Sequence, residues 1–394
     1  MKKSDLCVAR QKLLVPVEHY SGAFALIPPA TPLLGSLTGT HNELIRAHEA
    51  LSALKTLTEQ LPNPDLVMRT LDRREAVQSS QIEGTHAEVT DLLAYEATGS
   101  VEGLPSDVLV TLNYVKALDY GLKTVRNAQS VSALTNVLIK ELHTHLMDGV
   151  MGFKGAPGEF RRIQNWIGGF KIYDAKFVPP PANKVTDCMN DLQAYLQYTP
   201  SEEEQMVVSI VLRMAIAHAQ FETIHPFIDG NGRVGRLLLP LMLVAEGYPP
   251  IYLAGFLKSN QKDYYDTLAG VQLQEKWGDW IKFFAIGVEE AAHESMQTTK
   301  ALLLIRNRWQ MTLNTLAIRS DSAIYRLPEL LVANPVITVN KVKESLNISY
   351  PTANAALLKL KEMGILTQTD RQRNRAFIAT EVINLLDKNA KLLK

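Results

Sequence analysis

The chain has 394 residues, more than one domain usually contains, and 46% of them are hydrophobic. Its 41 basic and 41 acidic residues cancel, so the composition excludes a globally basic nucleic-acid binder and leaves only local patches open. Two cysteines, Cys7 and Cys188, cannot build a disulfide framework, and no apolar run is long enough for a signal peptide or a membrane span. These features predict a cytoplasmic protein with no membrane contact.

Apolar periodicity predicts a mostly helical chain. Residues 1–40 are expected to be irregular, because prolines and a glycine interrupt any helix there. Helices are expected from His41, over 65–82, as two helices between 108 and 147, over 185–196, over 203–222, from 234 to about 246, from 260 to about 271, and over 277–305. Pro240 should kink or restart the helix that contains it.

The helix over 65–82 ends in Ser79-Ser80-Gln81-Ile82-Glu83-Gly84. Gly84 suits the left-handed residue that commonly follows a helix. Glu83 then faces the negative end of the helix dipole. The pattern alone leaves two readings open: a cationic partner elsewhere in the chain, or an ordinary exposed glutamate.

Three of the histidines in the expected helices are candidates for a functional role. His143 and His145 are two residues apart and cannot share a helix face, so we expect packing or surface residues and not metal ligands. His218 shares the apolar side of its helix with Val211 and Ala215, which favours a core histidine over a catalytic one.

Residues 152–181 differ from the rest in composition. Strand-forming residues flank Gly168-Gly169, and three prolines close the segment, which predicts a β-hairpin in an otherwise helical protein. A long loop with aromatic anchors is the alternative.

The functional residues concentrate in one stretch, His225-Pro226-Phe227-Ile228-Asp229-Gly230-Asn231-Gly232-Arg233-Val234-Gly235-Arg236. Its glycines allow backbone N–H groups to approach an oxyanion, and the following helix start points further N–H groups at the same spot. Arg233 and Arg236 share a helix face, and each guanidinium can donate two hydrogen bonds to phosphate oxygens. Asp229 is a hard oxygen ligand suited to Mg²⁺, and His225 can accept a proton from a hydroxyl. A simple helix–helix turn would not account for the occurrence of all these polar residues together.

The last 70 or so residues are predicted to form a separate unit. A helix over 336–346, a turn, a second helix after Pro351, and two strands at 365–368 and 375–379 are typical of a winged helix. Its wing would hold Arg371, Arg373 and Arg375, which could contact phosphates. The expected recognition helix is mostly alanine and leucine, so protein contact or simple packing is favoured over DNA binding.

The stretch at 225–236 resembles the signature of the Fic-domain adenylyltransferases, His-Pro-Phe-x-Asp-Gly-Asn-Gly-Arg-x-x-Arg, with every defining position filled. The resemblance implies that His225 deprotonates a target hydroxyl and that Asp229 holds Mg²⁺ on the phosphates of ATP. It implies a nucleotide cradle formed by Gly230, Asn231, Gly232, Arg233, Val234, Gly235 and Arg236. It also places Tyr264 and Tyr265 beside the adenine and ribose, although adjacent tyrosines cannot both be core.

Two further segments gain an interpretation from the resemblance. Ser79, Glu83 and Gly84 match the inhibitory motif of Fic proteins, in which the glutamate would pair with Arg236 and block the γ-phosphate site. The hairpin around Ile167, Gly168 and Gly169 corresponds to the flap, whose backbone pairs with an extended target segment.

The sequence therefore predicts an all-α Fic fold with a small β-hairpin flap and a C-terminal winged helix. We expect an N-terminal helical region over 1–105 with the inhibitory helix at 65–84, a catalytic core over 106–305, and a connecting helix and winged helix over 306–394. The expected activity is transfer of AMP from ATP, with Mg²⁺, to a Thr, Ser or Tyr hydroxyl of a target protein or of the enzyme itself. The resemblance also makes a homodimer compatible with the chain.

Three alternatives stay open. The same fold could use another nucleotide donor, or remove AMP from modified proteins with the glutamate positioning water. A third possibility is a transcription regulator whose Fic domain senses nucleotide and whose wing binds DNA.

Overall fold

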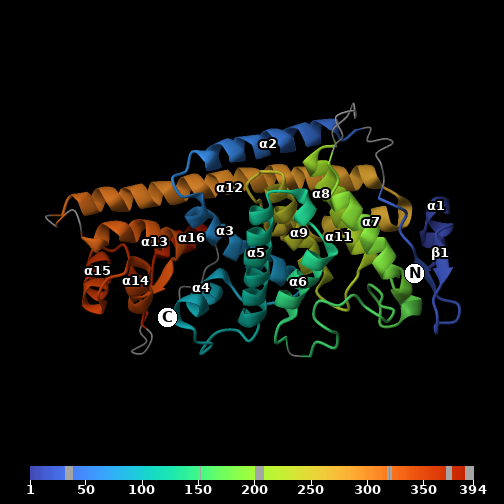
Figure 1. The fold of residues 1–394 in the computed structure, drawn as a ribbon, viewed down its shortest axis with the longest axis horizontal. Helices are drawn as coiled ribbons and strands as arrows, with labels where there is room; N and C mark the ends of the chain where they lie inside the picture. The colour runs from blue at the N-terminus through green and yellow to red at the C-terminus, as the bar shows by residue number, and fades with distance from the viewer. Residues whose placement is uncertain are drawn as a thin grey trace. The chain divides into compact units, whose positions relative to one another are not determined.

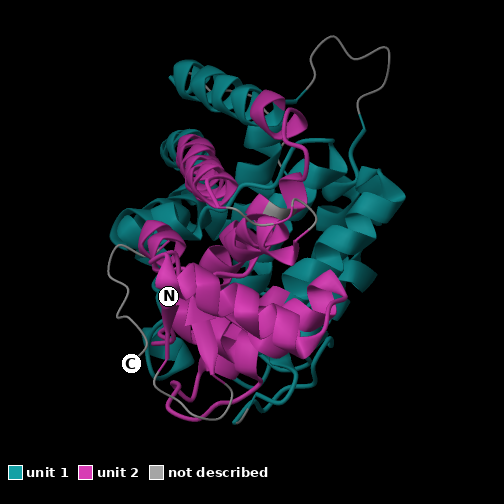
Figure 2. Cartoon of the chain, turned by 90° about the vertical axis from the view of Figure 1, so that its left-hand side faces the viewer, with its two compact units in different colours: residues 1–55, 116–292 teal, residues 56–115, 293–394 magenta. Residues whose placement is uncertain are grey.

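The computed structural model describes residues 1–31, 39–150, 152–199, 208–316, 319, 322–369 and 375–386. The chain is dominated by helices with a few short strands, which confirms the predicted all-α class (Figure 1). It divides into two compact units, each built from two segments of the chain (Figure 2). Unit 1 comprises residues 1–55 and 116–292, and unit 2 comprises residues 56–115 and 293–394. Among the described residues, no helix is long and apolar enough to cross a membrane.

Unit 1 is organised around helix α8, in which every residue is buried. A helix without a polar face belongs in the interior of a bundle. Helices α7 and α9 pack on α8, and α6 packs on α9. The helical elements with residues in unit 1 are η1 (Lys3–Asp5), α1 (Val8–Gln11), α2 (His41–Glu59), α5 (Val108–Ala128), η2 (Val131–Ala133), α6 (Asn136–Met147), η3 (Ile172–Asp174), η4 (Ala182–Lys184), α7 (Val185–Leu196), α8 (Ile210–Ile224), α9 (Asn231–Ala245), α10 (Ala254–Ser259), α11 (Gln261–Gln274) and α12 (Trp277–Asn314). Helices α2, α5 and α12 continue into unit 2.

Several helix boundaries differ from the prediction. Helix α8 begins at Ile210, and residues 203–207 of the expected helix lie outside the described residues. Helix α9 continues through Pro240 as one element, so no restart occurs there. The expected closing helices are one helix, α12, which runs to Asn314.

The N-terminal segment is more regular than predicted. Strands β1 (Leu14–Pro16) and β2 (Phe24–Leu26) form an antiparallel pair in which Leu14 faces Leu26. Residues 32–38, which include Pro32 and Gly35, lie outside the described residues. The prediction of an irregular segment is wrong for β1 and β2, because strands of three residues are too short to show an apolar alternation.

Unit 2 combines helices with a three-stranded sheet in the order β3-β5-β4. Helix α3 packs on α13, and α4 packs on β3. Its own elements are α3 (Pro64–Ile82), α4 (Val89–Thr98), η5 (Ala323–Arg326), α13 (Leu327–Ala333), β3 (Val336–Thr338), α14 (Val339–Leu346), α15 (Tyr350–Glu362), β4 (Thr367–Gln368), β5 (Ala376–Ile378) and α16 (Thr380–Leu386).

The C-terminal part of unit 2 has the expected succession of helix, turn, helix and strands. Residues 336–338 are strand and not helix, because they pair with β5 through Val336 and Ile378. Arg371 and Arg373 lie outside the described residues. Arg375 donates to Asn354 Oδ1 at 2.5 Å, so this predicted phosphate ligand is engaged inside the unit. The winged-helix assignment stays a prediction, and so does the expectation that it packs or contacts protein in preference to DNA.

Candidate active site

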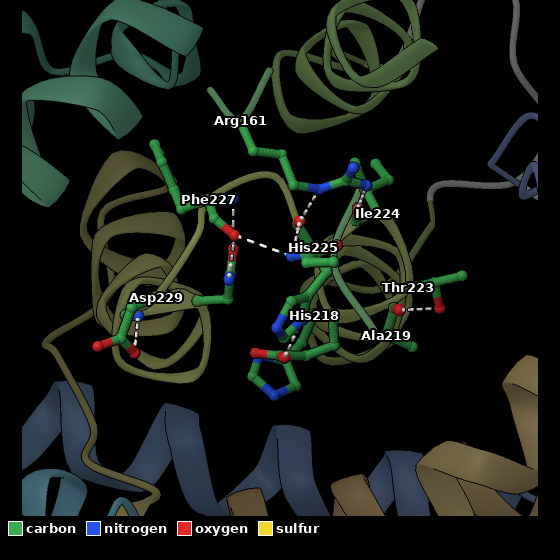
Figure 3. Close-up of polar contacts among 12 residues, drawn as sticks. Arg161, His218, Ala219, Thr223, Ile224, His225, Phe227 and Asp229 are labelled. Atoms are coloured by element: carbon green, nitrogen blue, oxygen red, sulfur yellow. Dashed lines mark hydrogen bonds and ion pairs between the residues drawn. The ribbon is translucent and has the colours of Figure 1, made fainter. Parts of the chain in front are cut away.

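The stretch at 225–236 forms the turn that joins α8 to α9 (Figure 3). His225 caps α8 in the left-handed conformation, with φ of 50°, and its N–H donates to Phe221 O at 2.9 Å. Gly230 caps the start of α9 with φ of 78°. A left-handed histidine is unfavourable for an isolated chain and persists only where neighbours hold it. Neighbouring groups must therefore hold His225 in this conformation.

Asn231 closes the turn. Its Oδ1 accepts a hydrogen bond from Phe227 N at 2.8 Å, and its Nδ2 donates to Phe227 O at 2.9 Å. Asn231 is buried, so breaking either bond would leave a polar group without water. Asn165, from a distant loop, donates a further hydrogen bond to Phe227 O at 3.1 Å. The amide of Asn231 thus braces the turn instead of pointing to solvent.

Arg161 also holds the turn, through the backbone of His225. Its Nε donates to His225 O at 2.9 Å, and its Nη2 donates to Pro180 O at 2.6 Å (Figure 3). Its own N–H donates to Pro226 O at 2.9 Å. Burial lowers the pKa of Arg161 to about 10, which still leaves the guanidinium protonated at neutral pH. The sequence did not single out Arg161, because nothing in a sequence marks an arginine that binds backbone carbonyls.

His143 supports the turn from α6. Its ring stacks on Phe227 with centroids 3.8 Å apart and planes within 2°. Gly158 N donates to its Nδ1 at 2.9 Å, so the ring proton lies on Nε2, which donates to Asp229 O at 3.1 Å. Burial lowers the pKa of His143 to about 4, so the ring is neutral at pH 7. The prediction of a packing residue is confirmed, and its bond to Asp229 is new.

The start of α9 has the properties of an anion site. The N–H groups in the first turn of a helix have no carbonyl acceptor four residues earlier, and the helix dipole is positive there. Asn231, Gly232 and Arg233 occupy that first turn. The Asp229 side chain is 63% exposed beside it, and its Oδ1 accepts from Gly230 N at 2.6 Å. The structure thus places an exposed carboxylate next to a positive helix end.

The remaining residues of the stretch face the interior. Arg233 and Arg236 are buried, and Arg233 Nη2 lies 3.9 Å from Asp229 Oδ1. Val234 is fully buried, and its N–H donates to Gly230 O within the helix. Gly235 faces α8. Both arginines are thus buried, and Val234 and Gly235 serve the packing of α9.

The two predicted tyrosines differ in burial. Tyr264 is buried, and its hydroxyl lies 2.9 Å from His218 Nε2. Tyr265 is 46% exposed, so only one of the two is core, as predicted. Burial, with Arg236 nearby, lowers the pKa of His218 to about 3. His218 is therefore the neutral core histidine that the sequence favoured.

The expected flap is a loop with one bridge and not a regular hairpin. Ile167 pairs with Phe177 in a single antiparallel bridge, and Ile167 N donates to Phe177 O at 2.9 Å. Beyond the bridge, Gly168 and Gly169 have φ of 68° and 80°, and η3 follows. The Asp174 carboxylate accepts from the backbone N–H of residue 171 at 2.7 Å. Side-chain capping thus replaces the further strand pairs that a hairpin requires.

The predicted inhibitory motif ends α3 in unit 2. Ser79 is buried within the helix, and Glu83 is its exposed C-cap residue. Gly84 follows with φ of 92°, which confirms it as the left-handed residue after the helix. Its N–H donates to Gln81 O at 3.1 Å.

No group of three or more His, Cys, Asp or Glu side chains is arranged to hold a metal within the described ranges. A metal at Asp229 would therefore need most of its ligands from phosphates and water, as Mg²⁺ commonly does.

Comparisons with known proteins agree with this geometry. Residues 41–123 match the Fic/DOC family N-terminal region, and residues 133–243 match the Fic/DOC family. A protein adenylyltransferase Fic from Aedes aegypti is 32% identical over 160 residues, covering 40% of this chain and 28% of the relative. Another from Drosophila willistoni is 31% identical over 240 residues, covering 60% and 42%. The chain thus spans less than half the length of these relatives.

Solved structures share the fold. A Fic family protein from Desulfovibrio desulfuricans has a TM-score of 0.54 and 20% identity, covering 90% of this chain and 98% of that one. Residues 134–508 of Fic-1 from C. elegans give a TM-score of 0.50 at 22% identity, covering 66% and 73%. With both family matches and the complete motif in the turn between α8 and α9, the chain contains the N-terminal region and the domain that define the Fic/DOC family.

Proposed function

We propose that the protein transfers AMP from ATP to a side-chain hydroxyl of a target protein. The observation that carries this proposal is the braced turn, in which His225 lies next to the positive start of α9. The relatives named protein adenylyltransferase Fic support it.

In the proposed reaction, His225 accepts the proton of the target hydroxyl while its oxygen attacks the α-phosphorus of ATP. The new oxygen–phosphorus bond forms as the bond between the α-phosphorus and the bridging oxygen breaks, and pyrophosphate leaves. The N–H groups at the start of α9, which have no acceptor within the helix, would stabilise charge on the phosphates, as would the guanidinium of Arg233. Because these donors are fixed before the substrate arrives, little reorganisation is needed during the reaction.

Asp229 fits the role of a magnesium ligand. Its carboxylate is mostly exposed, and carboxylate oxygens beside phosphates are the environment that Mg²⁺ prefers. A bound Mg²⁺ would neutralise phosphate charge. The hydrogen bond from His143 to Asp229 O fixes the backbone that carries this carboxylate.

We further propose that Glu83 restrains the activity by pairing with Arg236. The motif at the end of α3 supports this role. If Glu83 occupies the place of the γ-phosphate, then Glu83→Gly should raise transfer to a target or to the enzyme itself. Equal activity of both proteins would remove the inhibition proposal.

The position of the labelled phosphorus in ATP tests which group is transferred. We expect the Glu83→Gly protein, incubated with Mg²⁺ and a cell lysate, to raise incorporation of label from [α-³²P]ATP above that of the lysate alone, and to add no label from [γ-³²P]ATP to that transferred by the lysate kinases. UTP, GTP and CTP labelled at the α-phosphate serve as donor controls. Incorporation from the γ position would indicate a phosphotransferase and contradict the proposal, and so would preferred use of another nucleotide.

A further inference from the structure

The last turn of α8 carries a buried acid close to the proposed base. Glu222 lies three residues before His225, and its Oε2 is 3.8 Å from His225 Nδ1. The Glu222 side chain is 8% exposed and that of His225 is 22% exposed. Residues three apart on a helix lie on one face, and the left-handed cap keeps His225 within reach of its own helix. The contact therefore follows from the local fold of the turn.

Gly235 makes room for this acid. A Cβ at position 235 would lie 2.6 Å from Glu222 Oε1 and 3.2 Å from His218 Cε1. Such distances require the neighbours to move, so the absence of a side chain at Gly235 lets α9 pass beside the carboxylate. This gives Gly235 a function in the motif that involves no phosphate contact.

Other charged or titratable groups lie on α8, on α9, in the turn and in the preceding loop. They are Arg161, His218, Asp229, Arg233 and Arg236. Arg161 binds the carbonyl oxygen of His225 and not its ring, and Asp229 accepts from Gly230 N. His218 is neutral. Glu222 therefore presents a buried carboxylate to Nδ1 of the proposed base.

We propose that Glu222 is a positioning residue for His225, an inference that rests on the proposed function. Its carboxylate accepts the proton on Nδ1, which leaves Nε2 unprotonated to receive the hydroxyl proton. When the imidazolium forms, the negative charge stabilises it. The 3.8 Å separation shortens as the substrate orders the site, as hydrogen bonds between catalytic groups often do.

The variant Glu222→Gln, made in the Glu83→Gly protein, tests the inference. We expect kcat for AMP transfer to fall about 10- to 100-fold while KM for ATP stays within about twofold. Loss of the negative charge lowers the pKa of the imidazolium, so the acid limb of the pH–rate profile should move about one pH unit lower. Glu246→Gln is the matched control, because it removes a partly buried carboxylate paired with Arg213 near the same two helices. An unchanged kcat and pH profile in Glu222→Gln would overturn the inference.

A second measurement needs neither the variant nor the reaction. In ¹⁵N-histidine-labelled wild-type protein, the His225 signals can be assigned by comparison with His225→Ala. We expect the neutral ring to carry its proton on Nδ1, and a proton on Nε2 would overturn the inference. If neither the wild-type nor the Glu83→Gly protein transfers AMP, the proposed function fails. The position of the proton on the neutral His225 ring then still tests whether Glu222 positions that ring.

Discussion

Two parts of unit 1 contrast in how they are held: the turn at 225–236 and the loop at 163–177. The turn is fixed by buried side chains from two other segments, His143 of α6 and Arg161 of the loop that follows it. The loop has one backbone bridge, and it exposes Phe170 at 97% and Tyr173 at 59%. A fixed turn suits chemistry that needs preset geometry, whereas exposed aromatic side chains suit contact with a partner.

The contrast divides the proposed function into two physical parts. Residues in the turn should affect the rate of transfer and the stability of the fold together. Residues at the tip of the loop should affect the recognition of a target with little effect on stability. The following predictions test that division, beginning with the largest effect.

His225→Ala should reduce AMP transfer by at least about 10²- to 10⁴-fold, because it removes the proton acceptor. ATP binding by calorimetry should stay within a few-fold, because the N–H groups of α9 are unchanged. His19→Ala, at an exposed position, is the control. Transfer at the wild-type rate by His225→Ala would remove the assignment of the base.

Asn231→Ala should lower both stability and activity. It leaves the buried N–H of Phe227 without its acceptor, which costs about 1–3 kcal/mol, while the carbonyl of Phe227 keeps the hydrogen bond from Asn165. Displacement of the turn should reduce transfer about 10- to 100-fold. Urea unfolding and labelled transfer measure the two effects, and Asn231→Asp keeps the acceptor and should lose less. A variant that is inactive yet fully stable would contradict the bracing role.

His143 should make stability depend on pH. Its pKa is about 4 in the folded protein and about 6.5 when unfolded, so the unfolded state binds more protons between these values. Stability should therefore fall as pH decreases from 6.5 to 4, by an amount on the order of 3 kcal/mol for this residue. His218 contributes in the same direction. His143→Phe should flatten the dependence in urea unfolding across this range, and an unchanged slope would contradict it.

Phe170→Ala should have the smallest effect on the fold. The side chain is almost fully exposed, so the free energy of unfolding should change by less than about 0.5 kcal/mol. Transfer to lysate proteins should decrease while ATP binding stays the same. Val137→Ala is the control, at another exposed apolar position. Equal labelling by both variants would show that Phe170 does not contact the target.

The sequence predicted the parts of the site that are contiguous. His225, Asp229 and the two arginines lie in one motif, and the boundaries of α7 were predicted to the residue. It did not predict Arg161 or His143 as supports, because both bind backbone carbonyls more than 60 residues away. Residue type does not reveal such contacts.

The flap shows a second limit of prediction from sequence. Its strand-forming residues predicted a hairpin, yet Asp174 caps the turn at 170–174 and η3 interrupts the pairing. Gly169 permits this path, since a Cβ there would lie 2.6 Å from Asp174 O. Local side-chain hydrogen bonds outweighed strand propensity in this loop.

The most direct test is a crystal structure of the Glu83→Gly protein with Mg²⁺ and a non-hydrolysable ATP analogue. We expect the triphosphate at the start of α9, with its phosphates on the N–H groups of Asn231 and Gly232. The α-phosphorus should lie beside the imidazole of His225, with Mg²⁺ on Asp229. A nucleotide bound elsewhere, or an empty turn at saturating analogue, would contradict the account.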